Sequence, residues 1–251
     1  MKCRKSLGLG CIVEALERRQ LLSAATSISL KLSASSALLG QDVTATATVT
    51  SPGGSPRGTV EIFDNGTLIG QGPINKHGII AGTVGTLTNG TGGNVFSIGT
   101  NVFTAKYTGS ASFGSSRTRR GTNLAIAMPT LTKVRHSGGV RVATIYAGSG
   151  AAAVSGNTVN LAYSEYLTTG TLADSTVEER NAGHGTGDVS FQINSVPLTV
   201  ISGFNSGVVG MQTNEVRVID IPAAEAYGNN PPPGIPDNAE LFFVVGLISI
   251  S

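Results

Sequence analysis

Cysteine, histidine and tryptophan are scarce in this sequence. There is no tryptophan, and the only two cysteines in 251 residues, Cys3 and Cys11, lie near the N-terminus. The rest of the chain therefore has no disulfide, no cysteine metal site and no thiol nucleophile. The three histidines, His77, His136 and His184, share no ligand-like spacing. We expect neither a metal nor a cofactor.

Charge is also low, because only 13% of the residues are charged and the formal net charge is +2. The first 20 residues contain five of the cations and two acidic residues, a local charge of +3, which leaves −1 for the rest of the chain. A nearly neutral body gives no case for a nucleic-acid partner. The short basic run at 117–120 is typical of a solvated strand end or loop.

Long hydrophobic runs are absent, since no segment approaches the ~18 apolar residues of a membrane-spanning helix. Residues 1–26 form a leader that begins with positive charge and has a short apolar run, interrupted at Glu14. Residues 16–24 (LERRQLLSA) resemble the export signature of planctomycete surface proteins, with Arg18 at a position that is often Pro. The resemblance implies export to the periplasm, the cell surface or beyond. The alternative is an amphipathic starter helix with no special purpose.

What the sequence has in quantity is glycine, with 34 residues, and short alternating segments. Apolar residues alternate with Thr over 43–49, as in a strand with one buried face. Residues 59–64 predict a second strand, and Asn65-Gly66 predicts a type I′ turn into a hairpin partner at 67–70. Further strands are expected at 28–32, 79–87, 102–107 and 123–127. About seven strands over residues 27–128 predict an antiparallel β-sandwich.

Three patterns in this first domain resemble bacterial Ig-like domains of secreted and surface proteins. They are Gly40-Gln41-x-Val43-x-Ala45-x-Ala47-x-Val49, Gly58-Thr59-Val60-x-Ile62-Phe63-Asp64-x-Gly66 and Ala105-x-Tyr107-x-Gly109-x-Ala111-x-Phe113. The resemblance implies a spacer or weak adhesion module, which allows association with the cell surface.

A second domain is predicted at 140–251, after a short linker at 129–139. Strands are expected at 140–145, 157–163, 189–193, 215–221 and 240–250, the last of which is continuously apolar and must be central or buried. Apolar residues 201, 204, 208 and 211 have helical spacing. Because Gly203, Gly207 and Gly210 each weaken a helix by roughly 1 kcal/mol relative to Ala, packing must hold this helix in place. We expect an α+β domain with a concave apolar surface between helix and sheet.

Six spaced blocks in this domain resemble FKBP-type peptidyl-prolyl isomerases. The blocks are Gly156-x-x-Val159-x-x-x-Tyr163, Gly170-Thr171-Leu172-Ala173-Asp174-Ser175, Val200-Ile201-x-Gly203-Phe204-x-x-Gly207-Val208-x-x-Met211, Ile221-Pro222, Ala226-Tyr227-Gly228 and Gly234-Ile235-Pro236-x-x-Ala239-x-Leu241-x-Phe243. The resemblance implies an antiparallel sheet wrapped on a short helix, and proline-containing polypeptides as substrates.

The resemblance also implies the site. A cup for the proline ring is expected from seven side chains: Tyr163, Phe191, Val200, Ile201, Phe204, Ile235 and Phe243. The Ile201 N–H and the Tyr227 hydroxyl are expected to donate to substrate carbonyls, and Asp174 to orient the polar edge near Tyr163. Taken singly, each has a plainer explanation: core packing for the apolar residues, a loop cover for Tyr227 and a turn cap for Asp174.

One departure from the family pattern bears on activity. The family usually has Phe before the pocket Asp, and here that residue is Ala173. Loss of an aromatic wall predicts reduced but measurable isomerase activity. Two functional hypotheses remain: an exported isomerase that assists folding, and a binding module that holds proline-containing peptides with little or no turnover. A purely structural surface role fits the sandwich but leaves the pocket unexplained.

Overall fold

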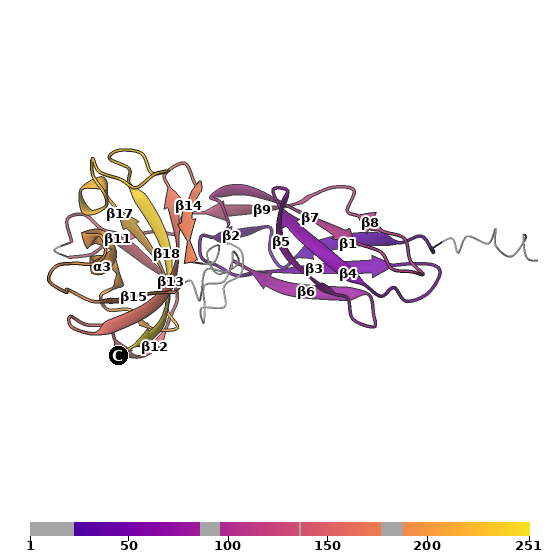
Figure 1. Ribbon diagram of the computed structural model, residues 1–251, viewed down its shortest axis with the longest axis horizontal. Helices are drawn as coiled ribbons and strands as arrows, with labels where there is room; N and C mark the ends of the chain where they lie inside the picture. The colour runs from indigo at the N-terminus through magenta and orange to yellow at the C-terminus, as the bar shows by residue number, and fades with distance from the viewer. Residues whose placement is uncertain (1–22, 86–95, 136, 177–187) are drawn as a thin grey trace, which may run out of the picture.

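A computed structural model describes residues 23–85, 96–135, 137–176 and 188–251. Within these ranges the chain is mostly β, with one α-helix, and forms two domains placed end to end (Figure 1). The predicted order of an Ig-like sandwich followed by an α+β domain is confirmed. Residues 1–22 of the leader, the end of the strand expected at 79–87, and His136 and His184 lie outside the described residues.

The first domain is built from two packed sheets. Its strands are β1 (Ser27–Leu32), β2 (Ser36–Leu38), β3 (Val43–Thr50), β4 (Thr59–Asp64), β5 (Thr67–Pro73), β6 (Ile79–Val84), β7 (Gly99–Tyr107), β8 (Ser116–Arg117) and β9 (Thr122–Ala127). One sheet has the order β1-β3-β6 and the other β2-β9-β7-β4-β5, with β8 paired to β7. Among the described residues the seven predicted strands are present, and the short β2 and β8 were not predicted.

Local sequence explains the first sheet and hairpin. Side chains of β3 alternate between buried and partly exposed along the strand, as the apolar–Thr alternation predicts. Asn65 and Gly66 have φ values of 46° and 86° and connect β4 to β5. Both positive φ values are those that a type I′ turn requires, so the predicted hairpin is confirmed.

The second domain combines a large antiparallel sheet with one helix. Its elements are β10 (Thr132–Lys133), β11 (Arg141–Tyr146), β12 (Ser149–Ala152), β13 (Thr158–Leu167), β14 (Leu172–Ser175), β15 (Val189–Gln192), α3 (Ser202–Val208), β16 (Gln212–Thr213), β17 (Val216–Ile221), the 3₁₀-helix η2 (Ala223–Glu225) and β18 (Leu241–Ile250). The sheet order is β10-β11-β17-β18-β13-β14, with β15 also paired to β13, while β12 pairs with β16. Because β10 pairs with β11, the segment predicted as a linker also contributes a strand to this sheet.

Glycines let α3 lie directly on β17. A Cβ added at Gly203 would lie 2.2 Å from Ile221 Cγ2, and one added at Gly207 would lie 2.4 Å from Ile219 Cγ2. Real Cβ atoms do not approach other carbons this closely, so only glycine fits at either position. The packing that the weak helix requires is therefore supplied by β17.

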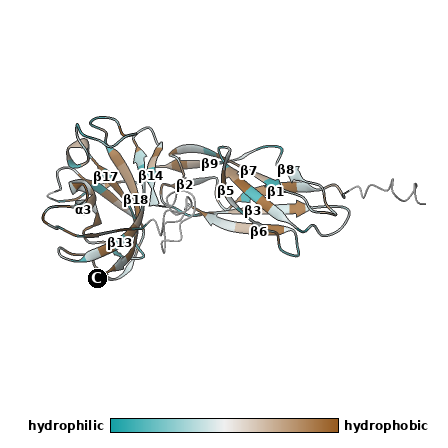
Figure 2. Cartoon of the chain, in the orientation of Figure 1, coloured by the Kyte–Doolittle hydropathy of each residue, from teal (hydrophilic) through white to brown (hydrophobic). Residues whose placement is uncertain are grey.

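The face of the large sheet opposite α3 is covered by the first domain. Tyr166, Val218 and Val244 on this face belong to one buried cluster with Leu39 of the sandwich. The Asp42 N–H donates to the Tyr146 hydroxyl at 2.8 Å across the same junction. The sheet is thus buried on both faces, and Figure 2 shows β18 coloured as apolar along most of its length. This explains why β18 is continuously apolar, as expected for a central strand. The helix side is left facing away from the sandwich (Figure 1).

Candidate functional site

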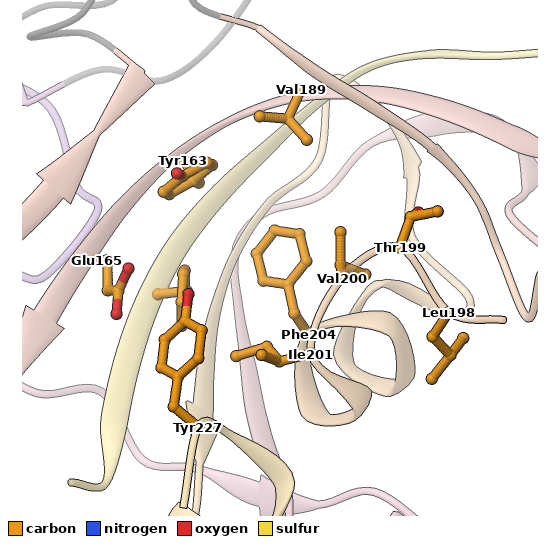
Figure 3. Close-up of a pocket in the computed structure, with 10 residues that line it drawn as sticks. Tyr163, Glu165, Val189, Leu198, Thr199, Val200, Ile201, Phe204 and Tyr227 are labelled. Carbon is orange, nitrogen blue, oxygen red and sulfur yellow. The ribbon is translucent and has the colours of Figure 1, made fainter. Parts of the chain in front are cut away.

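A cavity of about 400 Å³ lies between α3 and the large sheet. Its lining residues come from β13, β15, α3 with the segment before it, the loop after η2 and β18: Tyr163, Glu165, Val189, Leu198, Thr199, Val200, Ile201, Phe204, Tyr227 and Phe243 (Figure 3). This size and this mixture of aromatic and aliphatic walls with a few polar groups are typical of sites for small ligands or single side chains.

Aromatic rings form the floor of the cavity. The Phe204 ring from α3 lies 5.0 Å from Phe243 and 5.9 Å from both Tyr163 and Phe191, measured between ring centroids. Tyr163 and Phe243 are 5.7 Å apart. Such edge and tilted contacts hold the rings in fixed orientations. The floor is therefore a preformed apolar cup.

Tyr163 is fixed by a polar partner behind the cup. Its hydroxyl donates to Asp174 Oδ2 at 2.5 Å, and Asp174 Oδ1 accepts the Ser175 N–H at 2.8 Å. Burial, together with the bond to Asp174, raises the pKa of Tyr163 well above its ordinary value. The phenol stays protonated, and Asp174 orients the ring by accepting a hydrogen bond from its hydroxyl.

The rim of the cavity at Tyr227 is linked to α3 by a hydrogen bond. Ser202, the first residue of α3, donates to Glu225 Oε2 at 2.6 Å and lies 3.2 Å from the Glu225 carbonyl oxygen. Tyr227 follows two residues later and places its half-buried side chain at the cavity. Burial first, and then the charge of Glu165, raise the pKa of Tyr227, so its hydroxyl remains a donor at neutral pH. The Ser202–Glu225 contact fixes the Tyr227 loop relative to the Ile201 backbone.

Ala173 lies next to Asp174 and adds no wall to the cavity. Glu165 pairs with Asp174 and Tyr166 pairs with Leu172, so Ala173 is the extra residue of a β-bulge in β14. Its side chain is exposed and does not line the cavity. The aromatic wall that the family pattern places here is missing, as the sequence predicts.

Glu165 is a pocket residue that the sequence analysis missed. It is 3% exposed, and its Oε1 atom is buried without a hydrogen bond. Burial first, and then the nearby charge of Asp174, raise the pKa of Glu165 to about 7. Successive side chains of a strand alternate between faces, so Tyr163-x-Glu165 on β13 already places both on one face. This alternation of side chains along β13 was the sequence signal that could have identified Glu165.

The structure brings together most of the predicted site residues. Tyr163, Val200, Ile201, Phe204, Tyr227 and Phe243 line the cavity. Phe191 lies behind Phe204, Asp174 lies behind Tyr163, and Ile235 is partly buried against the same core. Val189, Leu198 and Thr199 also line the cavity and were not predicted. What each residue does to a substrate stays a prediction.

In the part of the chain that the structure describes, no group of three or more His, Cys, Asp or Glu side chains is placed to bind a metal ion. Across the same residues, no helix is long and apolar enough to span a membrane.

The fold and the cavity define an α+β domain with a preformed aromatic pocket, which follows an Ig-like sandwich along the chain. Residues 150–248 match the family model of FKBP-type peptidyl-prolyl cis-trans isomerases, and residues 30–127 match that of bacterial Ig-like domains of group 3. The chain therefore contains an FKBP-type domain after a bacterial Ig-like domain, in the order predicted from the sequence.

Curated relatives and solved structures match just under half of the chain. The chain is 38% identical over 117 residues to FK506-binding protein 3 of Eremothecium gossypii, covering 45% of this chain and 25% of that protein. It is 34% identical over 122 residues to FK506-binding protein 4 of Dictyostelium discoideum, covering 48% and 31%. Among solved structures, FkpA from Escherichia coli matches with 27% identity and a TM-score of 0.40, covering 48% of this chain and 51% of that one. The chain spans about a quarter of the length of the curated relatives it matches.

Proposed function

We propose that this chain is an exported peptidyl-prolyl cis-trans isomerase that assists protein folding and is displayed on an Ig-like spacer. The observation that supports it best is the aromatic cup of Tyr163, Phe204 and Phe243, with the Tyr227 side chain and the Ile201 backbone at its rim. Export is supported by the leader at 16–24 alone, and the Ig-like domain is consistent with a place at the cell surface.

The chemistry requires no acid, base or covalent step. Rotation about an X-Pro amide has a barrier of ~18–20 kcal/mol because resonance keeps the bond planar. The twisted transition state loses that resonance and is less polar than the planar amide, so an apolar, water-poor pocket favours it. The proline ring would sit in the cup, and the Tyr227 hydroxyl and Ile201 N–H would donate to the flanking carbonyls of the substrate.

Conformer exchange of a short Xaa-Pro peptide, followed with and without the protein, tests this function. Tyr227→Phe removes one donor, and we expect kcat/KM to fall about fivefold, the size of one neutral hydrogen bond. Tyr146→Phe is the matched control, because that hydroxyl lies at the domain junction and not at the cavity. Equal losses in the two variants would contradict a role for Tyr227 at the site.

The binding-module hypothesis is kept because Ala173 leaves one side of the cup without an aromatic wall. We expect Ala173→Phe to raise kcat/KM by about two- to tenfold, the size of one aromatic contact. The same peptides are also titrated for equilibrium binding. Binding without turnover in both the wild type and Ala173→Phe would favour the binding module and reject the enzyme.

A further inference from the structure

Within the cavity, Glu165 is the charged group that the proposed isomerase mechanism does not use. Figure 3 shows its side chain on the same side of β13 as Tyr163, at the end of the cavity where Tyr227 lies. Its Oε1 atom is buried and accepts no hydrogen bond. A buried polar atom without a partner costs stability, so its persistence in a binding cavity indicates a partner that arrives with the ligand.

The surroundings of Glu165 specify the charge of that partner. Three titratable groups lie near Glu165: Tyr163 on the same strand, Asp174 on β14 and Tyr227 in the loop after η2. Of the residues that the structure describes, none that lines the cavity is Lys, Arg or His. Among the described residues, the lining of the cavity therefore has one carboxylate, Glu165, and two phenols, with Asp174 behind Tyr163 and no cation. Its potential is negative and complements a positively charged ligand group.

Distance along the chain restricts where that positive group can be. Tyr163 and Glu165 are two residues apart on an extended strand, which separates their Cα atoms by about 7 Å. One residue of an extended peptide spans about 3.5 Å, and a lysine side chain adds a flexible four-carbon stem. With a proline ring held against Tyr163 and Phe204, a basic side chain on the adjoining residue can therefore reach the Glu165 carboxylate.

We infer that Glu165 is a specificity-determining residue that selects X-Pro segments in which the residue before proline is Lys or Arg. This inference rests on the proposed binding of proline in the aromatic cup. The cation of the ligand would pair with Glu165 Oε1, the oxygen that the protein itself leaves without a hydrogen bond, so recognition requires Glu165 in its ionised form.

The test uses two short peptides that differ only in the residue before proline, Lys or norleucine, which share the same stem but not the ammonium group. The full-length protein is titrated with each peptide, and cis-trans exchange is measured in parallel. At pH 8.5 lysine is charged and Glu165 is ionised, because burial and Asp174 raise the Glu165 pKa only to about 7. We expect about tenfold tighter binding of the Lys peptide, the size of a charge-assisted hydrogen bond.

Two comparisons assign the preference to Glu165. In Glu165→Gln the Lys and norleucine peptides should bind equally, whereas Glu61→Gln, in the first domain, should keep the wild-type ratio. In the unmodified protein the ratio should fall toward one at pH 5.5, where Glu165 is protonated; this measurement does not depend on how the variant folds. A preference that survives in Glu165→Gln, or that is absent from the wild type at pH 8.5, overturns the inference.

The outcomes also separate this inference from the proposed function. Tighter binding of the Lys peptide without turnover of either peptide would support the specificity and reject the enzyme. Turnover of both peptides at equal efficiency and affinity would support the enzyme and overturn the specificity. Failure of the Lys peptide alone to bind overturns the specificity, and failure of both peptides to bind overturns the proposed function as well.

Discussion

The Arg217 guanidinium donates from Nη1 to the Gly207 carbonyl oxygen at 2.8 Å and so joins β17 to the end of α3. The same nitrogen reaches the Val209 carbonyl oxygen at 3.1 Å, and the Nε and Nη2 atoms pair with Glu215 Oε1 at 2.8 Å. The last carbonyls of a helix have no partner within the helix. Arg217 supplies one, and it is itself almost fully buried. The helix that holds Phe204 is thus anchored at its C-terminal end by a side chain from the sheet.

Replacing this arginine should damage both stability and binding. Arg217→Met leaves Glu215, which is 4% exposed, as a buried charge without its cation. We expect a loss of about 3–5 kcal/mol in the free energy of unfolding, measured by urea titration. Affinity for proline peptides should fall in the molecules that remain folded, because Ile201 and Phe204 move with α3. Arg117→Met, at an exposed position of the first domain, is the control and should change neither quantity.

Close contact between α3 and β17 gives a second prediction. Alanine favours a helix over glycine by roughly 1 kcal/mol, so Gly207→Ala would stabilise an isolated helix. In the folded domain its Cβ would lie 2.4 Å from Ile219 Cγ2, and the resulting displacement of α3 should outweigh that gain. We expect a net loss of about 1–3 kcal/mol, as for overpacked cores. Gly82→Ala has open space around the new Cβ and should leave the unfolding midpoint nearly unchanged. A stabilised Gly207→Ala would show that the helix is free to move away from the sheet.

Much of this fold follows from local patterns in the sequence. Alternation predicts β3, the Asn65-Gly66 pair predicts the hairpin of β4 and β5, and the continuous apolar run at 240–250 predicts a central or buried strand. These features depend on residues that are neighbours along the chain. The spaced motifs that resemble FKBP-type isomerases predicted the type of the second domain and the residues of the aromatic cup.

Features that depend on contacts between distant segments were not predicted. The pairing of β10 with β11 requires a register that the short polar segment 129–139 does not specify alone. The cover of Tyr166 and Val244 by the first domain is a contact between domains, invisible to periodicity. Glu165 was missed because an acidic residue on a strand is most often solvated. Its burial comes from segments distant in sequence, among them β14 and the loop that carries Tyr227.

The domain junction gives a third prediction. Gly40 has φ +87°, and a Cβ there would lie 3.1 Å from Val244 Cγ1 and 3.3 Å from Ile145 Cγ1 of the second domain. Gly66 has nearly the same φ, +86°, with no neighbour within 4 Å. Gly40→Val and Gly66→Val therefore cause similar backbone strain, but only Gly40→Val places a side chain against the second domain.

We expect calorimetry to resolve this difference. The wild type should unfold in one transition, because a single buried cluster spans both domains. Gly40→Val should lower the midpoint more than Gly66→Val and separate the unfolding of the two domains. Identical thermograms for the two variants would mean that the junction does not couple the domains.

The ionisation of Glu165 gives a fourth prediction, on stability and pH. Its pKa is raised by burial from an ordinary value of 4.5 to about 7 in the folded chain. Between these values the folded state binds the proton more tightly than the unfolded state, so the stability due to this group is fully present below pH 4.5. It is lost as pH rises through 7. The free energy of unfolding of the wild type should therefore fall over this window relative to Glu165→Gln, by up to about 3 kcal/mol.

Comparison with the variant isolates this group. Asp64 and Asp220 also have pKa values raised to about 6 by burial, but they are present in both proteins and cancel in the difference. Urea titrations at half-unit steps from pH 4 to 8.5 would give that difference directly. A difference in unfolding free energy that stays constant across the range would show that the Glu165 carboxyl is solvated when it is ionised. The proposed selection of basic residues before proline would then lose its physical basis. A saturating Lys-Pro peptide should shift the midpoint of the fall to lower pH, because a bound cation favours the ionised carboxylate.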